Sequence, residues 1–267
     1  MAAVFTAEHR GGEGPPLLLI HGFTDTWRSW ALALGALARH HEVLAPTLAG
    51  HAGGPPLPEG AGADALLDAV EASMDRAGWS TAHVAGNSLG GHLALRLAAR
   101  GRADSVVALA PGGGWARDGD FFAAMLAPYF RTIRAQLAVA EPHFEELLAT
   151  PEGRRMATAQ VVENHEHIPA ELIAHQLHGV VACSGADALI ESAERDGWEL
   201  DAERIDCPVR IVWGAEDRIL PWPDCAKRHR EEWLPNADWA VLDGVGHLPQ
   251  LDVPIAAAEL ISGFALR

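Results

Sequence analysis

Lysine is almost absent from this sequence, in which Lys227 is the only one. Chemistry that needs a Schiff base to a lysine side chain would therefore depend on that single residue. Arginine does not balance the acidic residues, because 20 Lys and Arg stand against 36 Asp and Glu and give a formal charge of −16. A chain of this charge repels phosphate backbones and anionic lipid. We therefore expect neither nucleic acid nor a membrane surface among its partners.

Cysteine and long apolar runs are also scarce. Cys183, Cys207 and Cys225 are odd in number, lack C-x-x-C spacing and lie in mostly apolar segments, which indicates reduced, buried thiols. No stretch reaches the ~18 apolar residues of a membrane-spanning helix, and no basic region leads into an apolar run near the N-terminus. We expect a soluble, cytoplasmic protein.

Short strand-like runs alternate with helical patterns along most of the chain, which predicts βαβ units and a mainly parallel sheet. The runs rich in branched residues are 17–20, 43–45, 83–85, 106–109, 209–213 and 239–242. Helices are predicted at about 27–39, 63–77, 89–100, 223–233 and 254–266, the last with Asp252 as its N-cap. We predict an α/β core domain made of residues 1–111 and 204–267.

The alternation stops after the run at 106–109. Residues 112–203 carry helical patterns without a convincing strand, which predicts an inserted helical cap. Its first helix has an apolar face at three-to-four-residue intervals, formed by Phe121, Phe122, Met125, Leu126, Tyr129, Phe130 and Ile133. This face either packs on the core alone or also lines a substrate pocket. The pocket candidates are Trp115, Phe122, Met125, Leu126 and Tyr129, with Leu248 from outside the cap.

The segment Gly86-Asn87-Ser88-Leu89-Gly90 lies where an apolar strand meets an amphipathic helix. A sharp strand-to-helix turn of this kind needs small residues two before and two after the serine, because neighbouring backbone comes close. The five-residue pattern alone is weak, and its place between a strand and a helix is what supports it. We predict that Ser88 is a nucleophile at the N-terminus of a helix, where positive potential favours developing negative charge.

A serine hydroxyl needs a base at neutral pH, and histidine has the suitable pKa. Of 14 histidines, His247 stands out because its loop, GVGHLP, follows the last predicted strand, at the sheet edge where such folds place their sites. His21 follows another strand, but we expect its backbone to matter more than its ring. The remaining histidines fit loop, core or cap positions, and the segment Asn164-His165-Glu166-His167 is not an H-E-x-x-H zinc motif.

A third residue should hold the imidazole in one tautomer and stabilise its charged form. Asp217, directly after the run at 209–213, is the predicted partner, and the chain order Ser, Asp, His fits. Glu216 is expected to point away. Asp118 and Asp120 are the fallback, since they follow the strand before the cap.

Attack on an acyl carbon creates an oxyanion that needs two backbone donors. The predicted donors are the Leu89 N–H, at the start of the helix after Ser88, and the Phe23 N–H, in the turn His21-Gly22-Phe23. An ordinary strand-ending turn is the alternative explanation of that segment. Thr24 and Asp25 follow it and receive no specific role.

Four segments together resemble the α/β-hydrolase superfamily: HGF at 21–23, GNSLGG at 86–91, GAEDRILP at 214–221 and GHLPQLDVP at 246–254. The resemblance spans nearly the whole chain outside the cap. It implies the α/β-hydrolase fold, the triad of Ser88, Asp217 and His247, and the two oxyanion donors. Because the superfamily hosts many reactions, the resemblance alone leaves the substrate open.

Positions at which this sequence differs from known branches of the superfamily reduce the number of reactions to consider. Thr47 stands where members often have aspartate, which is usually a structural position. Ser88 occupies the place of the aspartate nucleophile of haloalkane dehalogenases and epoxide hydrolases, and Tyr129 alone cannot supply the tyrosine pair of many epoxide hydrolases. Leu248 replaces the lysine of hydroxynitrile lyases and the tryptophan that is typical of carbon-carbon bond hydrolases.

We therefore predict a cofactor-free serine hydrolase that cleaves small-molecule esters of small-to-medium apolar acyl groups through an acyl-enzyme. A carbon-carbon bond hydrolase of the meta-cleavage product type or a lactone hydrolase is the main alternative. Perhydrolase or cofactor-free dioxygenase chemistry and a non-catalytic binding protein on the same scaffold come after it. The pattern does not determine the oligomeric state.

Overall fold

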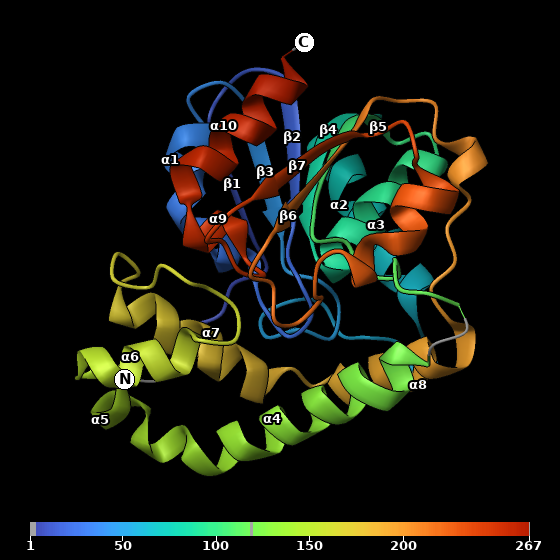
Figure 1. Ribbon diagram of the computed structural model, residues 1–267. Helices are drawn as coiled ribbons and strands as arrows, with labels where there is room; N and C mark the ends of the chain where they lie inside the picture. The colour runs from blue at the N-terminus through green and yellow to red at the C-terminus, as the bar shows by residue number, and fades with distance from the viewer. Residues whose placement is uncertain (1–3, 118–119, 267) are drawn as a thin grey trace.

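The computed structural model describes residues 4–117 and 120–266, and within them seven strands form one sheet in the order β1-β3-β2-β4-β5-β6-β7 (Figure 1). The strands are β1 (Glu8–Gly11), β2 (Pro16–Ile20), β3 (Glu42–Pro46), β4 (Ala82–Asn87), β5 (Ala103–Leu109), β6 (Val209–Gly214) and β7 (Asp238–Leu242). β1 runs antiparallel to β3, and every other neighbouring pair is parallel.

The central strands are buried on both faces, because side chains that alternate along a strand enter two apolar layers. In β2, Leu18 and Ile20 belong to one apolar cluster, whereas Leu17 and Leu19 belong to the other. The first cluster includes α2 (Ala63–Ala77) and α3 (Leu89–Ala99). The second includes α1 (Ala31–Leu37) and α10 (Pro254–Ala265), on the opposite face of the sheet (Figure 1).

A helical insertion lies between β5 and β6, on the side of the core away from the C-terminus (Figure 1). It comprises η2 (Phe122–Leu126), a π-helical turn, followed by α4 (Ala127–Ala140), η3 (Glu141–His143), α5 (Phe144–Leu148), α6 (Pro151–Thr158), α7 (Ala170–Ala182) and α8 (Ala186–Asp196). The short turn η4 (Ala202–Arg204) leads back to β6. The predicted α/β class with a mainly parallel sheet and a helical insertion is confirmed.

Three local expectations are wrong. β1 was not expected, and the helix expected at 223–233 is replaced by two short turns, η5 (Asp224–Ala226) and η6 (His229–Trp233). Asp252 does not cap the last helix. It ends the short helix α9 (Pro249–Asp252), and Val253 stands at the N-cap of α10. The helix expected at 27–39 begins with the 3₁₀ turn η1 (Trp27–Trp30) and continues as α1.

The three cysteines carry free thiols. Cys183 and Cys225 are buried and Cys207 is half-buried. Burial raises the pKa of Cys183 and Cys225 to about 12, so these thiols stay protonated at neutral pH. Among the helices of residues 4–117 and 120–266, none combines the length and apolarity that a membrane crossing requires.

Candidate active site

Ser88 lies on the sharp turn between β4 and α3, with φ of 57° and ψ of −117°. A positive φ is strained for a residue with a side chain, at a cost on the order of 1–3 kcal/mol, and such strain is typical of functional sites. The neighbouring glycines permit the turn. A Cβ on Gly86 would lie 2.1 Å from the Gly90 carbonyl oxygen, and one on Gly90 would lie 2.2 Å from the Ile20 carbonyl oxygen. Only glycine fits at either position.

His247 lies in the loop between β7 and α9, and its Nδ1 is 2.7 Å from Oδ2 of Asp217. Both side chains are buried. The other carboxylate oxygen of Asp217, Oδ1, accepts hydrogen bonds from the backbone N–H groups of Ile219 and Leu220, at 2.9 and 2.8 Å. These donors fix the carboxylate, and the carboxylate in turn orients the imidazole, so that Nδ1 carries the proton and Nε2 is left as the acceptor.

Two side chains hold the loops that carry this pair. The indole N–H of the buried Trp213, in β6, donates to the Leu220 carbonyl at 2.9 Å and fixes the loop of Asp217. Asn87, directly before the serine, donates through Nδ2 to the His247 carbonyl at 3.0 Å and to the Leu109 carbonyl at 3.2 Å. Sequence reasoning gave Asn87 no such role, although a buried amide at the end of an apolar strand is a signal for one.

Asp252 links the loop that carries His247 to the helical insertion. Its carboxylate accepts from the Gly246 N–H at 2.6 Å, from the Glu163 N–H at 2.9 Å and from both the backbone and the side chain of Asn164, each at 2.7 Å. This explains why the expected capping role is wrong. The buried carboxylate satisfies donors of two loops that lie far apart in sequence, and these include the residue before His247.

The two predicted oxyanion donors lie at neighbouring strand ends. Leu89 opens α3 after Ser88, and Phe23 follows β2. Within the described residues, neither the Phe23 nor the Leu89 backbone N–H donates a hydrogen bond to another protein group. The turn at Gly22 packs closely against Ser88, because a Cβ added to Gly22 would lie 3.4 Å from Cβ of Ser88.

The His21 ring fixes the turn that carries Phe23, although we expected its backbone to matter more than its ring. Nδ1 is 2.7 Å from the Gly22 carbonyl oxygen, and Nε2 accepts from the Leu48 N–H at 2.9 Å. Burial lowers the pKa of His21 well below its usual value. The neutral ring therefore donates with one nitrogen and accepts with the other, and it bridges two loops.

Asp120 and Glu216, two of the other acids considered, do not join this arrangement. Asp118 lies outside the described residues, and Asp120 and Glu216 are exposed. Thr47, which replaces an aspartate common in relatives, is buried and donates to the Thr6 carbonyl at 3.0 Å. Its contact is structural.

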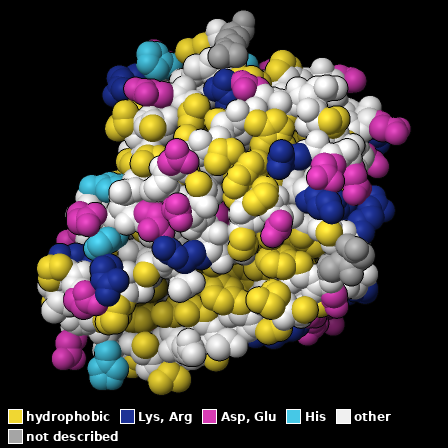
Figure 2. Space-filling view, viewed as in Figure 1, with side chains coloured by type: hydrophobic (Ala, Val, Ile, Leu, Met, Phe, Trp, Pro, Cys, Tyr) yellow, Lys and Arg dark blue, Asp and Glu magenta, His cyan; other side chains and the backbone are white. Residues whose placement is uncertain are grey.

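Two cavities meet at Ser88, and Phe23, Phe130 and Ile219 also border both of them. The first, which we name the tryptophan cavity, has a volume of about 430 Å³ and is lined among others by Leu89, His92, Trp115, Phe122, Leu126, Leu189 and Trp198. The second, the histidine cavity, has a volume of about 240 Å³ and is lined among others by Asp25, Tyr129, Met156, Gln176, His247 and Leu248. Figure 2 shows hydrophobic side chains gathered in a recessed band between the core and α4.

The pocket candidates fall into three groups. Trp115, Phe122 and Leu126 line the tryptophan cavity, whereas Tyr129 and Leu248 line the histidine cavity. Met125 lines neither and is 61% exposed, so its assignment was wrong. It belongs to the π-helical turn η2, whose wider winding departs from the α-helical spacing on which the assignment relied.

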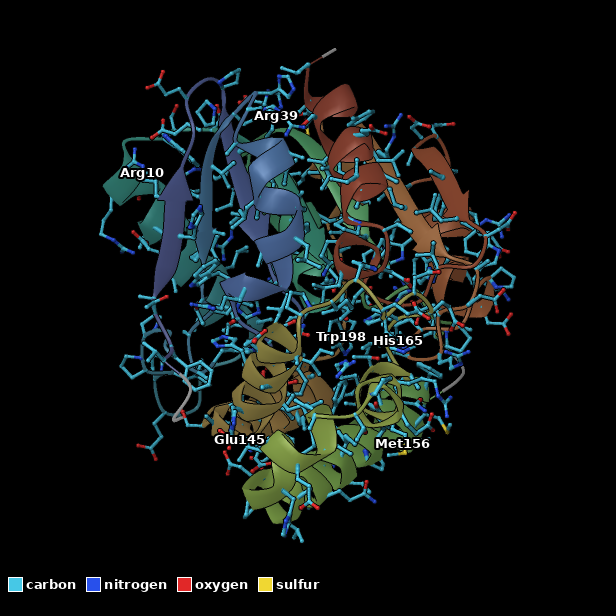
Figure 3. All side chains as sticks on the ribbon, turned by 90° about the vertical axis from the view of Figure 1, so that its left-hand side faces the viewer. Arg10, Arg39, Glu145, Met156, His165 and Trp198 are labelled. Carbon is cyan, nitrogen blue, oxygen red and sulfur yellow. The ribbon has the colours of Figure 1, made fainter. Side chains whose placement is uncertain are left out.

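Trp198 was not expected in the site. It lies where the insertion meets the core (Figure 3), and its ring packs against His92 and Phe122 with centroids 5.1 and 5.3 Å away. Burial lowers the pKa of His92 to about 3, so its ring is neutral. The tryptophan cavity therefore has an aromatic wall without positive charge from this histidine.

Comparison with known proteins gives the following relationships. Residues 17–260 match the model of the alpha/beta hydrolase family. The chain is 33% identical over 200 residues to the epoxide hydrolase EphH of Mycobacterium tuberculosis, and the match covers 74% of this chain and 92% of that protein. It is 30% identical over 251 residues to a pimeloyl-(acyl-carrier protein) methyl ester esterase of Chromobacterium violaceum, with 90% of each covered.

Among solved structures, the chain is similar to a thermophilic esterase from Thermogutta terrifontis. The TM-score is 0.73 at 20% sequence identity, over 97% of this chain and 92% of that one. At this identity the likeness concerns the fold.

Proposed function

Because the chain belongs to the α/β-hydrolase family, we propose that it is a serine hydrolase that cleaves carboxylic esters of small-to-medium apolar acids through an acyl-enzyme. The observation that carries this proposal is the buried pair of His247 and Asp217, 2.7 Å apart, on a cavity that Ser88 also lines. No cofactor takes part in the proposed reaction.

In the first step, Oγ of Ser88 attacks the carbonyl carbon of the ester, and its proton passes to Nε2 of His247. The Asp217 carboxylate stabilises the imidazolium that results. The carbonyl oxygen becomes an oxyanion and accepts hydrogen bonds from the N–H groups of Phe23 and Leu89. Both amides are free to serve because no group among the described residues accepts from them.

In the second step, the tetrahedral intermediate collapses and His247 gives its proton to the leaving alkoxide, which departs as the alcohol. Water then attacks the acyl-enzyme while His247 takes its proton. The second collapse returns that proton to Oγ of Ser88 and releases the carboxylic acid. Each proton thus enters and leaves through the same imidazole, and Ser88 and His247 end as they began.

The likeness to an epoxide hydrolase does not lead us to propose epoxide opening. A serine oxygen that opened an epoxide would form an alkyl ether, which the same histidine and water could not hydrolyse. An acyl serine, in contrast, is an ester that water can attack. The chemistry of Ser88 therefore favours acyl substrates, and the 30% identity to a methyl ester esterase agrees with that choice.

The test is the hydrolysis of p-nitrophenyl esters of increasing acyl length by the wild type, Ser88→Ala and Ser80→Ala. Ser80 is exposed and serves as the matched control. We expect ester turnover in the wild type and Ser80→Ala, and a loss of about 10⁴-fold or more in Ser88→Ala. A dione ring-fission substrate and a lactone are measured in parallel. Rapid dione cleavage with negligible ester turnover would replace this proposal by carbon-carbon bond hydrolysis.

A further inference from the structure

The two cavities at Ser88 differ in which one contains the proton donor. His247 lines the histidine cavity and does not line the tryptophan cavity, whereas Leu89, a proposed oxyanion donor, lines the tryptophan cavity. In the proposed reaction His247 must protonate the leaving oxygen, so the leaving alcohol occupies the histidine cavity. The acyl group then extends into the tryptophan cavity. This division rests on the proposed function.

Among the described residues that line the histidine cavity, Asp25 is the only carboxylic acid, and none is lysine or arginine. Most of the other residues there are apolar, and three aromatic rings belong to them: Phe23, Tyr129 and Phe130. Asp25 is half-buried, and no lysine or arginine side chain in this cavity balances its charge. Groups of this kind rarely persist without a partner, which makes Asp25 a candidate for substrate recognition.

The hydrogen bonds to Asp25 hold its carboxylate in place but leave some of its acceptor positions unused. Oδ1 accepts from the Thr26 N–H at 2.7 Å, and Oδ2 accepts from Nε2 of Gln176 at 3.3 Å. Gln176 belongs to α7 in the insertion, so donors from the core and from the insertion fix the two oxygens. A carboxylate accepts about four hydrogen bonds, so further donors can bind. Within the described parts of the chain, no ion pair involves Asp25.

The energetics favour a cationic partner over a neutral one. Burial raises the pKa of Asp25 to about 6, so the group is mostly ionised at pH 7.5 but its charge is poorly solvated. A cation in the cavity would relieve this cost, and the aromatic rings of the same cavity attract a cation through their faces. The formal charge of −16 on the chain also raises the local concentration of cations.

We propose that Asp25, held by Gln176, binds a protonated amine carried by the leaving alcohol, and that the preferred substrates are esters of amino alcohols. Asp25 is then a specificity-determining residue. It binds a group remote from the scissile bond and takes no part in bond making.

Three butanoate esters of nearly equal shape test this proposal: the 2-(dimethylamino)ethyl, the 3-methylbutyl and the 3-hydroxybutyl ester. The first two differ only in a protonated nitrogen in place of a CH group. We expect the wild type to prefer the amine ester over the 3-methylbutyl ester by about 10- to 100-fold in kcat/KM at pH 7.5. Asp25→Asn should reduce this ratio to near one while it still hydrolyses the 3-methylbutyl ester.

Asp68→Asn is the matched control, because it removes one negative charge at an exposed position on α2 that pairs with Arg100. It should keep the wild-type preference. If Asp25→Asn does not fold, inhibition of the wild type decides instead. We expect 2-(dimethylamino)ethanol to inhibit hydrolysis of the 3-methylbutyl ester at lower concentration than 3-methylbutan-1-ol.

The outcomes separate the two proposals. If the wild type hydrolyses the esters through Ser88 but treats the amine and 3-methylbutyl esters alike, the role of Asp25 is overturned and the proposed function stands. A preference for the 3-hydroxybutyl ester also overturns the cationic partner. If no ester of any kind is hydrolysed, the proposed function itself fails.

Discussion

At the scale of single residues, the two carboxylate oxygens of Asp217 have different hydrogen-bond partners. The effect of replacing Asp217 by asparagine can therefore be predicted. In Asp217→Asn the backbone N–H groups of Ile219 and Leu220 would retain the amide oxygen at the Oδ1 position. The amide nitrogen would then face Nδ1 of His247 and donate to it. The imidazole would be forced into the tautomer with its proton on Nε2, which cannot accept the proton of Ser88.

We therefore expect Asp217→Asn to lower kcat for ester hydrolysis by about 10⁴-fold with little change in KM. Glu216→Gln is the matched control, since it makes the same acid-to-amide change at the exposed neighbouring residue and should leave kcat unaltered. Steady-state kinetics with a p-nitrophenyl ester measure both, and circular dichroism verifies the fold. A loss below 10-fold in Asp217→Asn would mean that another acid orients His247.

Sequence reasoning could place Ser88, His247 and Asp217 because each follows a recognisable strand, and parallel strands end at one edge of the sheet. It could not identify the hydrogen-bond partners of Asn87 and Asp252. Their hydrogen bonds join loops that lie 160 and 88 residues apart, and nothing local encodes such partners.

At the scale of elements, the close contact between β2 and α3 depends on Gly90. A Cβ at Gly90 would meet the backbone oxygens of Ile20 and His21 at 2.2 and 2.5 Å, and backbone in a central strand cannot give way cheaply. We expect Gly90→Ala to lower the free energy of unfolding by about 3 kcal/mol or more. Urea denaturation followed by circular dichroism measures this change.

Gly35 is the matched control in the same kind of element. It is exposed within α1, and nothing lies within 4 Å of the Cβ that it would gain. Gly35→Ala should therefore raise the free energy of unfolding by about 0.5–1 kcal/mol, because alanine loses less conformational entropy in a helix. Equal effects of both substitutions would show that the packing of α3 on β2 is not the limiting contact.

The elements that sequence reasoning missed have weak local signals. The segment of β1, Glu8 to Gly11, is short and mostly polar, and it becomes a strand because an edge position on β3 offers backbone partners. The segment 223–233 has a helical pattern, but two short turns form there, around aromatic contacts of His229 with Trp213 and Trp233. Tertiary packing decides both cases.

At the scale of the whole molecule, the buried histidines couple stability to pH. Six imidazoles are at least nine-tenths buried and have lowered pKa values: His21, His41, His51, His92, His175 and His229. Burial is the first cause in each case, and the pKa is about 4 for His51 and His175 and about 3 for His92 and His229. The folded protein keeps these rings neutral, whereas the unfolded chain protonates them below about pH 6.5.

The sign of the effect follows from proton binding. Between pH 6.5 and about 4 the unfolded chain binds more protons than the folded one, so stability is complete above pH 6.5 and is lost as the pH falls. Each of the four histidines with a pKa of about 3 or 4 contributes a loss of about 2 kcal/mol at pH 5. Asp25 acts in the opposite direction, because its pKa is raised to about 6 and its ionisation weakens the fold as the pH rises. One carboxyl group cannot offset six imidazoles.

We therefore expect the melting temperature to change little between pH 8 and 7 and to fall steeply below about pH 6.5, with unfolding at room temperature near pH 4–5. The losses of the four histidines with a pKa of about 3 or 4 sum to about 8 kcal/mol at pH 5, which is comparable to the 5–15 kcal/mol that stabilises a typical domain. Scanning calorimetry from pH 8 to 4.5 measures the slope. His229→Leu should reduce the difference in bound protons between the unfolded and the folded protein by about one, and so make the slope smaller. Neither ring nitrogen of His229 has a hydrogen-bond partner among the described residues, so leucine removes no hydrogen bond. A melting temperature that stays constant from pH 7 to 5 would mean that the folded protein admits protons to these rings, and that the interior around them opens to water.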